Sequence, residues 1–237
     1  MKKVLFTLLS ACLLYSCSPK FYIPNTQNVP LLSEKGETNL TVAGNANQVE
    51  VQGAYAITNA FAMKANAGLF IPSDQDNGNG GSGKFAELGA GYFKPFESRL
   101  VFEAYGIAGI GTVENHFPST VDNYPQTNGE ISATVFRYGV QTNFGYKTKH
   151  FAAALSSRFV NLNYSNIEGN LIFNDVQQTD YLRDNRSSFL IEPAITLRGG
   201  FEKFKLQAQY GYSLNLSNSE FKQDNAFVTL GLNFNFK

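Results

Sequence analysis

The stretch that decides the fold is KFKLQAQYGYSLNLS, residues 203–217, in which apolar and polar residues alternate almost without error. The C-terminal stretch AFVTLGLNFNF, residues 226–236, repeats the scheme, with Phe227 as the one apolar residue on the polar face. A period of two is typical of a β-strand with one apolar and one polar side. Both stretches exceed the usual strand length of about five to six residues.

Strands of this length are what a tilted membrane-spanning barrel needs, which is about 9–11 residues each. Alternating or apolar runs separated by turn residues recur along the chain. They predict ten strands, at residues 37–44, 48–57, 61–70, 85–93, 100–113, 130–147, 150–164, 188–198, 203–217 and 226–236. In the seventh run the pattern changes near Phe159 and Val160, which we interpret as a bulge or as the point where the strand leaves the membrane.

The connections between these runs also alternate in length. Those after the third, fifth, seventh and ninth runs are long and polar, whereas those after the second, fourth, sixth and eighth are short. The sequence therefore predicts an all-β fold, a single antiparallel up-and-down transmembrane β-barrel of about ten strands. Its short turns would face the periplasm and its longer loops the cell exterior.

The N-terminus has the features of a secretory signal. Lys2 and Lys3 precede a short apolar stretch, 4–15, which is too short to cross a bilayer as a helix. The motif Leu14-Tyr15-Ser16-Cys17 resembles the bacterial lipoprotein signal, in which acyl groups such as palmitate are attached to the cysteine. A plain signal peptide, with Cys17 incidental, is the alternative.

Cysteine use favours lipidation. The chain has two cysteines, and Cys12 would be removed with the signal, so that Cys17 alone would remain. A disulfide is then impossible, and two acyl chains at Cys17 would give a stable anchor. We expect a signal peptide at 1–16, a lipidated tether in the periplasm at 17–36, and the barrel at 37–237.

The resemblance to small outer-membrane β-barrel proteins of Gram-negative bacteria covers residues 37–237 and rests on alternation and terminal features. It implies an outer-membrane location, with the lipid at Cys17 in the periplasmic leaflet. It also implies outer-membrane lipids and the barrel-assembly machinery as partners. The ending Phe234-Asn235-Phe236-Lys237 is similar to the C-terminal signature that this machinery recognises.

In such a barrel the polar face would line the lumen and the apolar face would contact lipid. We expect an interior ion-pair network of charged residues, namely Glu50, Lys64, Glu87, Glu103, Arg137, Arg158, Glu192, Arg198, Lys203 and Lys205. Aromatic residues at the periplasmic strand ends would form a belt at the membrane interface, namely Phe61, Tyr92, Phe96, Phe144, Tyr146, Phe151, Phe204, Phe234 and Phe236.

No catalytic motif or metal-ligand spacing is present, and we expect no enzyme activity, cofactor or metal. Asp74-x-Asp76 and Glu114-x-His116 resemble the paired residues of the ten-stranded omptin proteases, but the resemblance covers four residues. A lipid A deacylase needs its histidine and serine on the lipid-facing wall. Here His116 and Ser119 fall in the expected loop 115–128.

Removal of the signal would leave a net charge of about −2, and nothing indicates nucleic acid as a partner. Three functions stay open. The first is a barrel with a mostly filled polar lumen and a structural, adhesive or surface-binding role, whose extracellular partner the sequence does not name. The second is a narrow channel for small polar solutes or ions. The third is a soluble, lipocalin-like, lipid-anchored carrier of a hydrophobic ligand, since reversing the faces of the sheet preserves the alternation.

Overall fold

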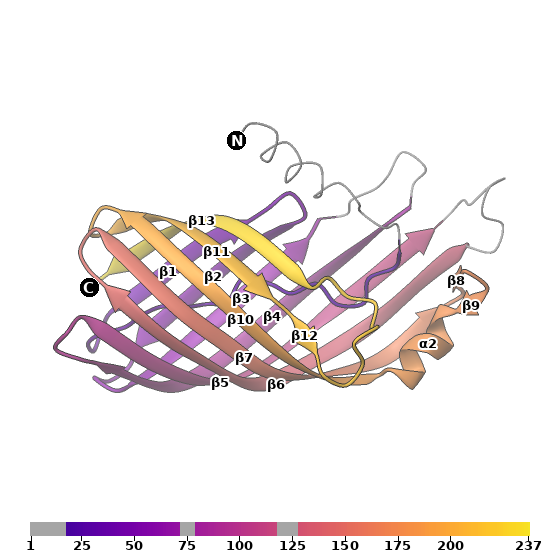
Figure 1. Ribbon diagram of the computed structural model, residues 1–237, viewed down its shortest axis with the longest axis horizontal. Coiled ribbons are helices and arrows are strands. Elements are labelled where there is room, and N and C mark those ends of the chain that lie inside the picture. Colours follow the sequence, from indigo (N-terminus) through magenta and orange to yellow (C-terminus); the bar gives the residue numbers. More distant parts are fainter. Residues whose placement is uncertain (1–17, 72–78, 118–127) are drawn as a thin grey trace, which may run out of the picture.

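The computed structural model describes residues 18–71, 79–117 and 128–237, and the signal region 1–16 and Cys17 lie outside them. Ten antiparallel strands form a closed barrel, which confirms the predicted fold (Figure 1). The wall strands are β1 (Thr38–Gly44), β2 (Gln48–Ala56), β3 (Phe61–Phe70), β4 (Gly80–Pro95), β5 (Leu100–Phe117), β6 (Gly129–Lys147), β7 (Phe151–Gly169), β10 (Ser187–Gly200), β11 (Phe204–Tyr212) and β13 (Ala226–Phe236).

Sequence neighbours pair around the ring from β1 to β7. The pairing of β7 with β10, of β10 with β11, of β11 with β13 and of β13 with β1 then closes it. The short strand β12 (Leu214–Asn215) continues β11 after an interruption at Ser213 and pairs with β10. The long connection between β7 and β10 holds β8 (Ile172–Phe173), β9 (Val176–Gln177) and helix α2 (Gln178–Asp184). Among the described residues, no helix is long and apolar enough to cross a bilayer.

The strands differ in length, which gives the barrel an uneven rim. β5, β6 and β7 have 18, 19 and 19 residues, whereas β1, β2 and β3 have 7, 9 and 10. At the short-turn end all strands finish together, so the extra length projects entirely beyond the long-loop end (Figure 1). We call these two ends of the barrel the turn end and the loop end.

Several strand boundaries differ from the prediction. β4 begins at Gly80 rather than 85, because Gly80–Lys84 pairs with Thr112–His116 on β5 despite its loop-like composition. β5 and β7 likewise extend to Phe117 and Gly169. Helix α2 was not predicted, because its seven residues are too few to show a helical period.

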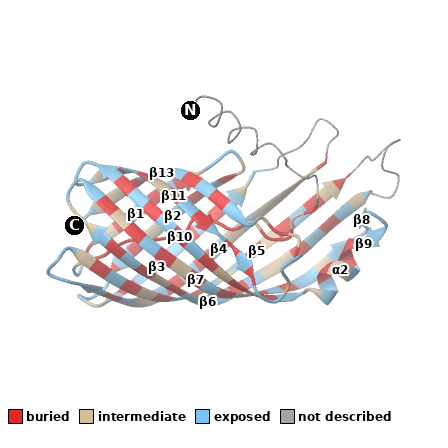
Figure 2. Ribbon diagram, in the orientation of Figure 1, coloured by how far each residue is buried: buried red, intermediate tan, exposed pale blue. Residues whose placement is uncertain are grey.

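The polar face of each strand points inward and the apolar face outward, as the alternating burial in Figure 2 shows. On β11, Lys205, Gln207 and Gln209 are buried, whereas Leu206 and Tyr210 are 62% and 51% exposed. The lipocalin-like alternative is therefore wrong, because it requires the apolar face to line the interior.

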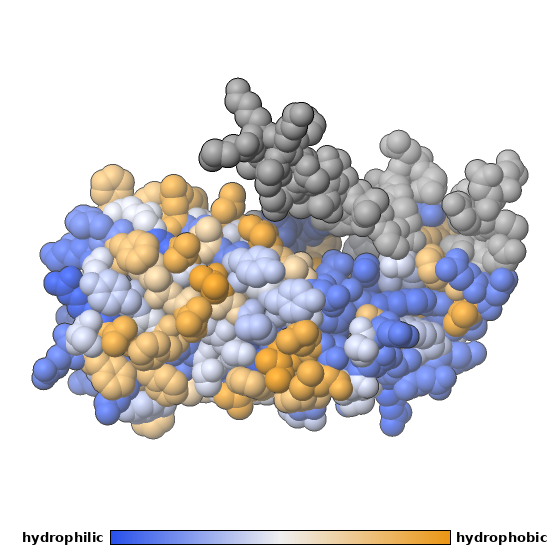
Figure 3. Space-filling view, viewed as in Figure 1, coloured by the Kyte–Doolittle hydropathy of each residue, from blue (hydrophilic) through white to orange (hydrophobic). Residues whose placement is uncertain are grey.

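The outward apolar residues form a band around the turn-end half of the barrel. Figure 3 shows hydrophobic side chains concentrated there, and hydrophilic residues covering the end that carries β8, β9 and α2. Patches on soluble monomers rarely exceed a few hundred Å². A continuous apolar band on a closed barrel is the surface of a protein that crosses a membrane.

The pattern change in β7 is not a bulge. Val160, Leu162 and Tyr164 are buried in the same alternation as Ser156 and Arg158 below them. The pairing of β7 with β6 and with β10 keeps its register through Phe159 and Val160. From Val160 onward the inward residues of β7 are apolar, so the polarity changes while the alternation of sides continues. Phe227, the misfit of β13, is likewise inward and buried.

The clearest departure from the prediction concerns residues 18–36. We expected a tether in the periplasm, but the structure places this segment inside the barrel, where Phe21, Tyr22 and residues 24–32 are buried. An interior full of polar wall residues, described below, is the physical reason.

The apolar band can be tested at Leu230, which lies near the middle of β13 and is 67% exposed. Leu230→Arg should lower the free energy of unfolding by about 2–4 kcal/mol, because a charge at the bilayer midplane is costly. Chemical denaturation of the barrel in lipid vesicles measures this. Ser219→Arg, in an exposed loop, is the control and should change little. An unchanged stability of Leu230→Arg would contradict a lipid-facing role for β13.

Candidate functional site

The lumen is the candidate site, and residues 21–32 occupy it. We call these residues the lumen segment. It begins at the loop end, where the Phe21 amide donates to the Lys222 carbonyl at 2.8 Å. It finishes near the turn end, where the Leu31 carbonyl accepts from Lys147 Nζ at 2.8 Å. The segment therefore runs the length of the barrel before β1 starts back at Thr38.

Between Ile23 and Leu32 the segment's polar main-chain groups are bound by side chains of the wall. The amides of Thr26, Gln27 and Leu32 donate to Glu50, Gln209 and Glu103 at 2.8, 2.6 and 2.9 Å. Wall side chains also donate to carbonyls of the segment: Gln52 donates to Thr26, Gln209 to Gln27, Gln141 to Asn28 and Arg198 to Val29. Buried main-chain groups need hydrogen-bond partners. These bonds supply them, so the segment can be buried in the lumen without pairing with a strand of the wall.

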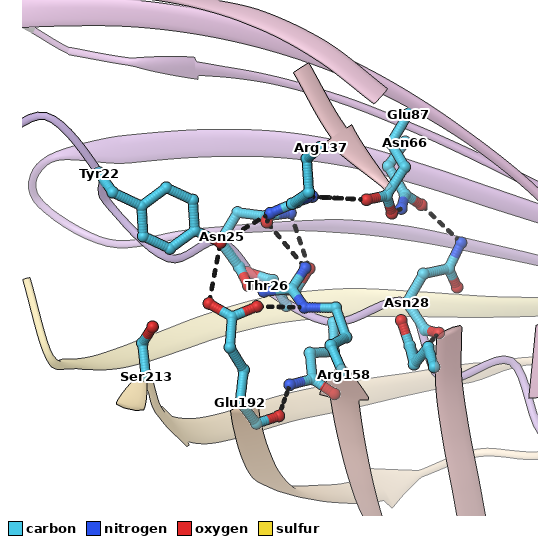
Figure 4. A network of polar contacts seen from close by, with 12 residues as sticks. Tyr22, Asn25, Thr26, Asn28, Asn66, Glu87, Arg137, Arg158, Glu192 and Ser213 are labelled. Atoms are coloured by element: carbon cyan, nitrogen blue, oxygen red, sulfur yellow. Dashed lines mark hydrogen bonds and ion pairs between the residues drawn. The ribbon is translucent and has the colours of Figure 1, made fainter. Parts of the chain in front are cut away.

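Asn25 links the lumen segment to two arginines of the wall. Its side-chain oxygen accepts from Arg137 Nη1 at 2.7 Å and from Arg158 Nη1 at 2.8 Å, as Figure 4 shows. Arg158 Nη2 also donates to the Asn25 carbonyl at 2.8 Å. A single amide thus bridges two guanidinium groups from β6 and β7.

Each of these arginines also has a carboxylate partner in the wall. Arg137 pairs with Glu87 at 2.6 Å, and Arg158 pairs with Glu192 at 2.8 Å. The Tyr22 hydroxyl donates to Glu192 at 2.8 Å and accepts from Arg137 at 3.0 Å. Tyr22 and Asn25 therefore join the two ion pairs into one network (Figure 4).

Glu50 has no arginine partner of this kind. Its carboxylate accepts from the amide and the hydroxyl of Thr26, at 2.8 and 2.9 Å, and from Asn25 Nδ2 at 3.2 Å. The main function of this buried carboxylate is therefore to hold the lumen segment. Without the segment it would lose all three bonds.

Toward the turn end the contacts become partly apolar. Leu31 packs against the wall at Gly145, where an added Cβ would lie 2.6 Å from a Leu31 methyl group. Val29 and Leu31 share a buried cluster with Val101, Ala152 and Ala154. The lumen segment thus leaves little free space beside the wall.

A small cavity, of about 50 Å³, lies between the lumen segment and the wall near Arg137. A buried water needs at least about 10–15 Å³ of such volume, so this cavity has room for a few waters. At the turn end a wider, basic vestibule of about 760 Å³ is lined by residues that include Lys147, Lys205 and Lys237. Leu31 and Leu32, which end the lumen segment, are both fully buried.

An aromatic cluster covers the loop end. Phe21 stacks on Tyr181 of α2 at 5.8 Å between ring centroids, and Tyr181 stacks on Phe221 at 6.3 Å. Lys222 lies 4.8 and 4.6 Å from the rings of Phe173 and Tyr181. Burial in this cluster lowers the pKa of the Lys222 ammonium to about 8 and raises the pKa of the Tyr181 hydroxyl. The cluster therefore buries Phe21, the first residue of the lumen segment.

The structure places nine of the ten predicted lumen residues inside the barrel, all of them buried: Glu50, Lys64, Glu87, Glu103, Arg137, Arg158, Glu192, Arg198 and Lys205. Lys203 is an exception to the prediction, because it lies exposed on the turn between β10 and β11. Arg137, Glu87, Arg158 and Glu192 form direct ion pairs. Lys64 and Arg198 instead donate to the amides of Gln141 and Gln207 and to carbonyls of the lumen segment.

The nine predicted belt residues all lie on the outer surface near the turn end. Phe61 and Tyr92 meet edge to face at 6.0 Å, and Phe204 packs against Phe234 at 5.3 Å. Phe96, Phe144, Tyr146, Phe151 and Phe236 are each exposed by more than a third.

The residues weighed for catalysis do not assemble in the described chain. Asp74, Asp76 and Ser119 lie outside the described residues. His116 is on β5 and not in a loop, because the strand extends to Phe117. Among the described residues, no group of three or more His, Cys, Asp or Glu side chains is arranged to hold a metal.

Sequence reasoning missed the lumen segment, although the sequence carries one signal of it. Residues 21–33 contain no charged side chain, between Lys20 and Glu34. A solvated tether is normally rich in charged and small polar residues. An uncharged stretch with three amide side chains, at Asn25, Gln27 and Asn28, suits a polar interior better.

Comparisons with known proteins show a similarity in overall fold to solved structures, and no similarity in sequence to a family or a curated protein. No protein-family model matches the sequence, and no curated protein matches it. Among solved structures, the KdgM porin has 10% identity and a TM-score of 0.40, covering 85% of this chain and 99% of the porin. LpxR from Salmonella typhimurium has 10% identity and a TM-score of 0.37, covering 84% and 99%. OmpT, an outer membrane protein of Vibrio cholerae, has 8% and 0.27, covering 84% and 95%. At these scores the likeness has no bearing on function.

The contribution of the Arg158–Glu192 pair to stability can be tested, because both side chains are fully buried. Arg158→Met should lower the free energy of unfolding by about 3–5 kcal/mol, because it leaves Glu192 buried without its cation. The double variant Arg158→Met/Glu192→Leu should recover most of this loss. Denaturant titration followed by tyrosine fluorescence measures it, since the chain has no tryptophan.

Lys149→Met is the matched control. It breaks the exposed pair between Lys149 and Glu202, 3.5 Å apart, and should cost less than about 1 kcal/mol. A loss for Arg158→Met as small as that of this control would show that the buried pair does not hold the network together.

Proposed function

We propose that this protein is an outer-membrane β-barrel lipoprotein that keeps its lumen closed with its own N-terminal segment and acts through its outer loops. Its role would be structural, adhesive or surface-binding, without enzyme activity. The observation that supports this most is the occupied lumen, in which wall side chains bind the main chain from Thr26 to Leu31. The outward apolar band supports the membrane location (Figure 3).

The surface available for a partner lies at the loop end. β5, β6 and β7 project beyond the shorter strands, and α2 with β8 and β9 packs against this projection. Leu182 of α2 and Leu171 are buried in the same cluster as Leu162 and Leu190 of the wall, so the loop is packed onto the barrel. A preorganised loop of this kind can bind a partner without first paying for ordering.

Two further parts of the proposal concern biogenesis. Cys17 would carry the lipid, as the signal motif predicts. Phe236, at the turn end and 46% exposed, would present the C-terminal aromatic to the barrel-assembly machinery.

A narrow channel is the second candidate, and the polar lining of the lumen favours it. Lys64, Glu87, Arg137 and Gln141 are wall residues that a moving solute could contact if the lumen segment withdrew. In that case the segment would be a gate and not a permanent plug.

Planar-bilayer recording separates the two candidates. The full chain should show no stable conductance steps, whereas a variant that lacks residues 21–32 should show them, because its lumen would be filled with water. Steps from the full chain would instead favour the channel.

A substitution variant covers the case in which the deletion does not fold. Glu50→Gln with Thr26→Val keeps the chain length, removes the bond from the Thr26 hydroxyl and replaces the charged acceptor of the Thr26 amide with a neutral one. It should show brief openings that the full chain lacks. A folded deletion variant that stays silent would contradict closure by the lumen segment.

A further inference from the structure

The direction in which the lumen segment runs has a consequence for where the N-terminus lies. At the loop end, the Asn115 side chain on β5 binds the main chain of Lys20 twice, accepting from its amide and donating to its carbonyl, both at 2.9 Å. Lys20 Nζ lies 3.5 Å from the Asp224 carboxylate, in the loop before β13. Lys20 is therefore held between two elements of the loop end.

The loop before β13 also pairs with the next residues of the chain, Phe21 and Tyr22. Tyr22 and Gln223 form a parallel bridge, with the Phe21 amide donating to Lys222 at 2.8 Å and the Asp224 amide donating to Tyr22 at 2.9 Å. The Phe21 carbonyl accepts from the Tyr164 hydroxyl at 2.9 Å. These bonds fix the point at which the chain enters the lumen.

The other end of residues 18–36 lies among the short turns. The Lys35 amide donates to Asn59 Oδ1 at 2.9 Å, and the Gly36 amide donates to the Ala56 carbonyl at 2.9 Å. Both partners belong to the β2–β3 turn region. An extended chain spans about 3.3–3.6 Å per residue, so residues 20–35 can cover about 50 Å. A hydrocarbon core is roughly 30 Å thick, so the segment is long enough to cross it. The contacts at its two ends, with Asn115 at the loop end and Asn59 at the turn end, show that it runs from one end of the barrel to the other.

We infer that the chain is threaded outward through its own barrel, so that residues 18–20 emerge on the cell surface, where an N-terminal lipid would enter the outer leaflet. The inference rests on the proposed membrane location, because short turns face the periplasm and long loops the exterior in such barrels. It replaces the expectation that the lipid at Cys17 lies in the periplasmic leaflet. The partner of this N-terminus is the lipid surface outside the barrel.

The shape of the rim suits this exit. Asn115 and Asp224 lie on β5 and before β13, and the strands between them in the ring include β1, β2 and β3. β1, β2 and β3, with 7, 9 and 10 residues, are far shorter than β5, β6 and β7, so the rim is low on that side (Figure 1). The chain therefore leaves the barrel where the membrane boundary is nearest.

Epitope labelling on intact cells tests the inference in the full chain. A short epitope inserted between Ser18 and Pro19 should bind antibody on intact cells as strongly as the same epitope inserted after Ser219 in the outer loop. An epitope inserted after Glu202, in a short turn, should bind only after the outer membrane is permeabilised. Binding at Ser18 only after permeabilisation, with the Ser219 control positive, would overturn the inference.

A cysteine variant covers the case in which the insertion disturbs the segment. Ser18→Cys should react with a membrane-impermeant maleimide on intact cells, above the background of the unmodified chain. Labelling of Ser18→Cys only in lysed cells would again overturn the inference. Failure of the proposed function gives a different result, because the protein would be absent from the outer-membrane fraction, or the Ser219 and Glu202 controls would exchange their behaviour.

Discussion

The structure depends on the requirement that polar groups inside a narrow barrel find partners. The interior holds buried carboxylates, among them Glu50, Glu87, Glu103 and Glu192, and several buried cations. Each would be costly to leave unpaired away from water. Wall residues meet part of this requirement through the Arg137–Glu87 and Arg158–Glu192 pairs. The lumen segment meets much of the rest, since Asn25, Thr26 and the Leu32 amide bind groups that the wall leaves free.

The requirement also holds for the segment itself. A chain with regular strand pairing would satisfy its main-chain groups through a neighbouring strand, but this segment lies away from the wall ladder. Side chains with both donors and acceptors can serve instead. Gln209, for example, accepts from the Gln27 amide and donates to the Gln27 carbonyl. The amide-rich wall and the uncharged segment are therefore two parts of one polar interior.

The barrel and its facing were predictable from the sequence because a period of two is a local signal. Alternation alone predicts which side chains point inward and which point outward, without knowledge of any partner strand. Examples are Leu206, Gln207, Ala208 and Gln209. The inward position of Arg158 and Glu192 followed from the same rule, although their pairing depended on register between β7 and β10. Lys203 was assigned by alternation beyond the point where the strand ends, and there the rule no longer applies.

The lumen segment and the loop-end extensions were not predictable in this way. Residues 21–32 show no periodicity, because their conformation is set by contacts with strands up to about 200 residues away, such as the bond between Thr26 and Thr229. Gly80–Lys84 reads as a loop by composition, yet pairing with β5 makes it a strand. In both cases long-range contacts outweigh the local preference of the sequence.

Hydrogen exchange of the lumen-segment amides, measured on the full chain in lipid bilayers, tests the account most directly. The amides of Thr26, Gln27 and Leu32 should exchange as slowly as those of the barrel strands, because each donates to a buried wall acceptor. Exchange at the rate of an unstructured peptide, with the strands still protected, would show that the segment does not occupy the lumen.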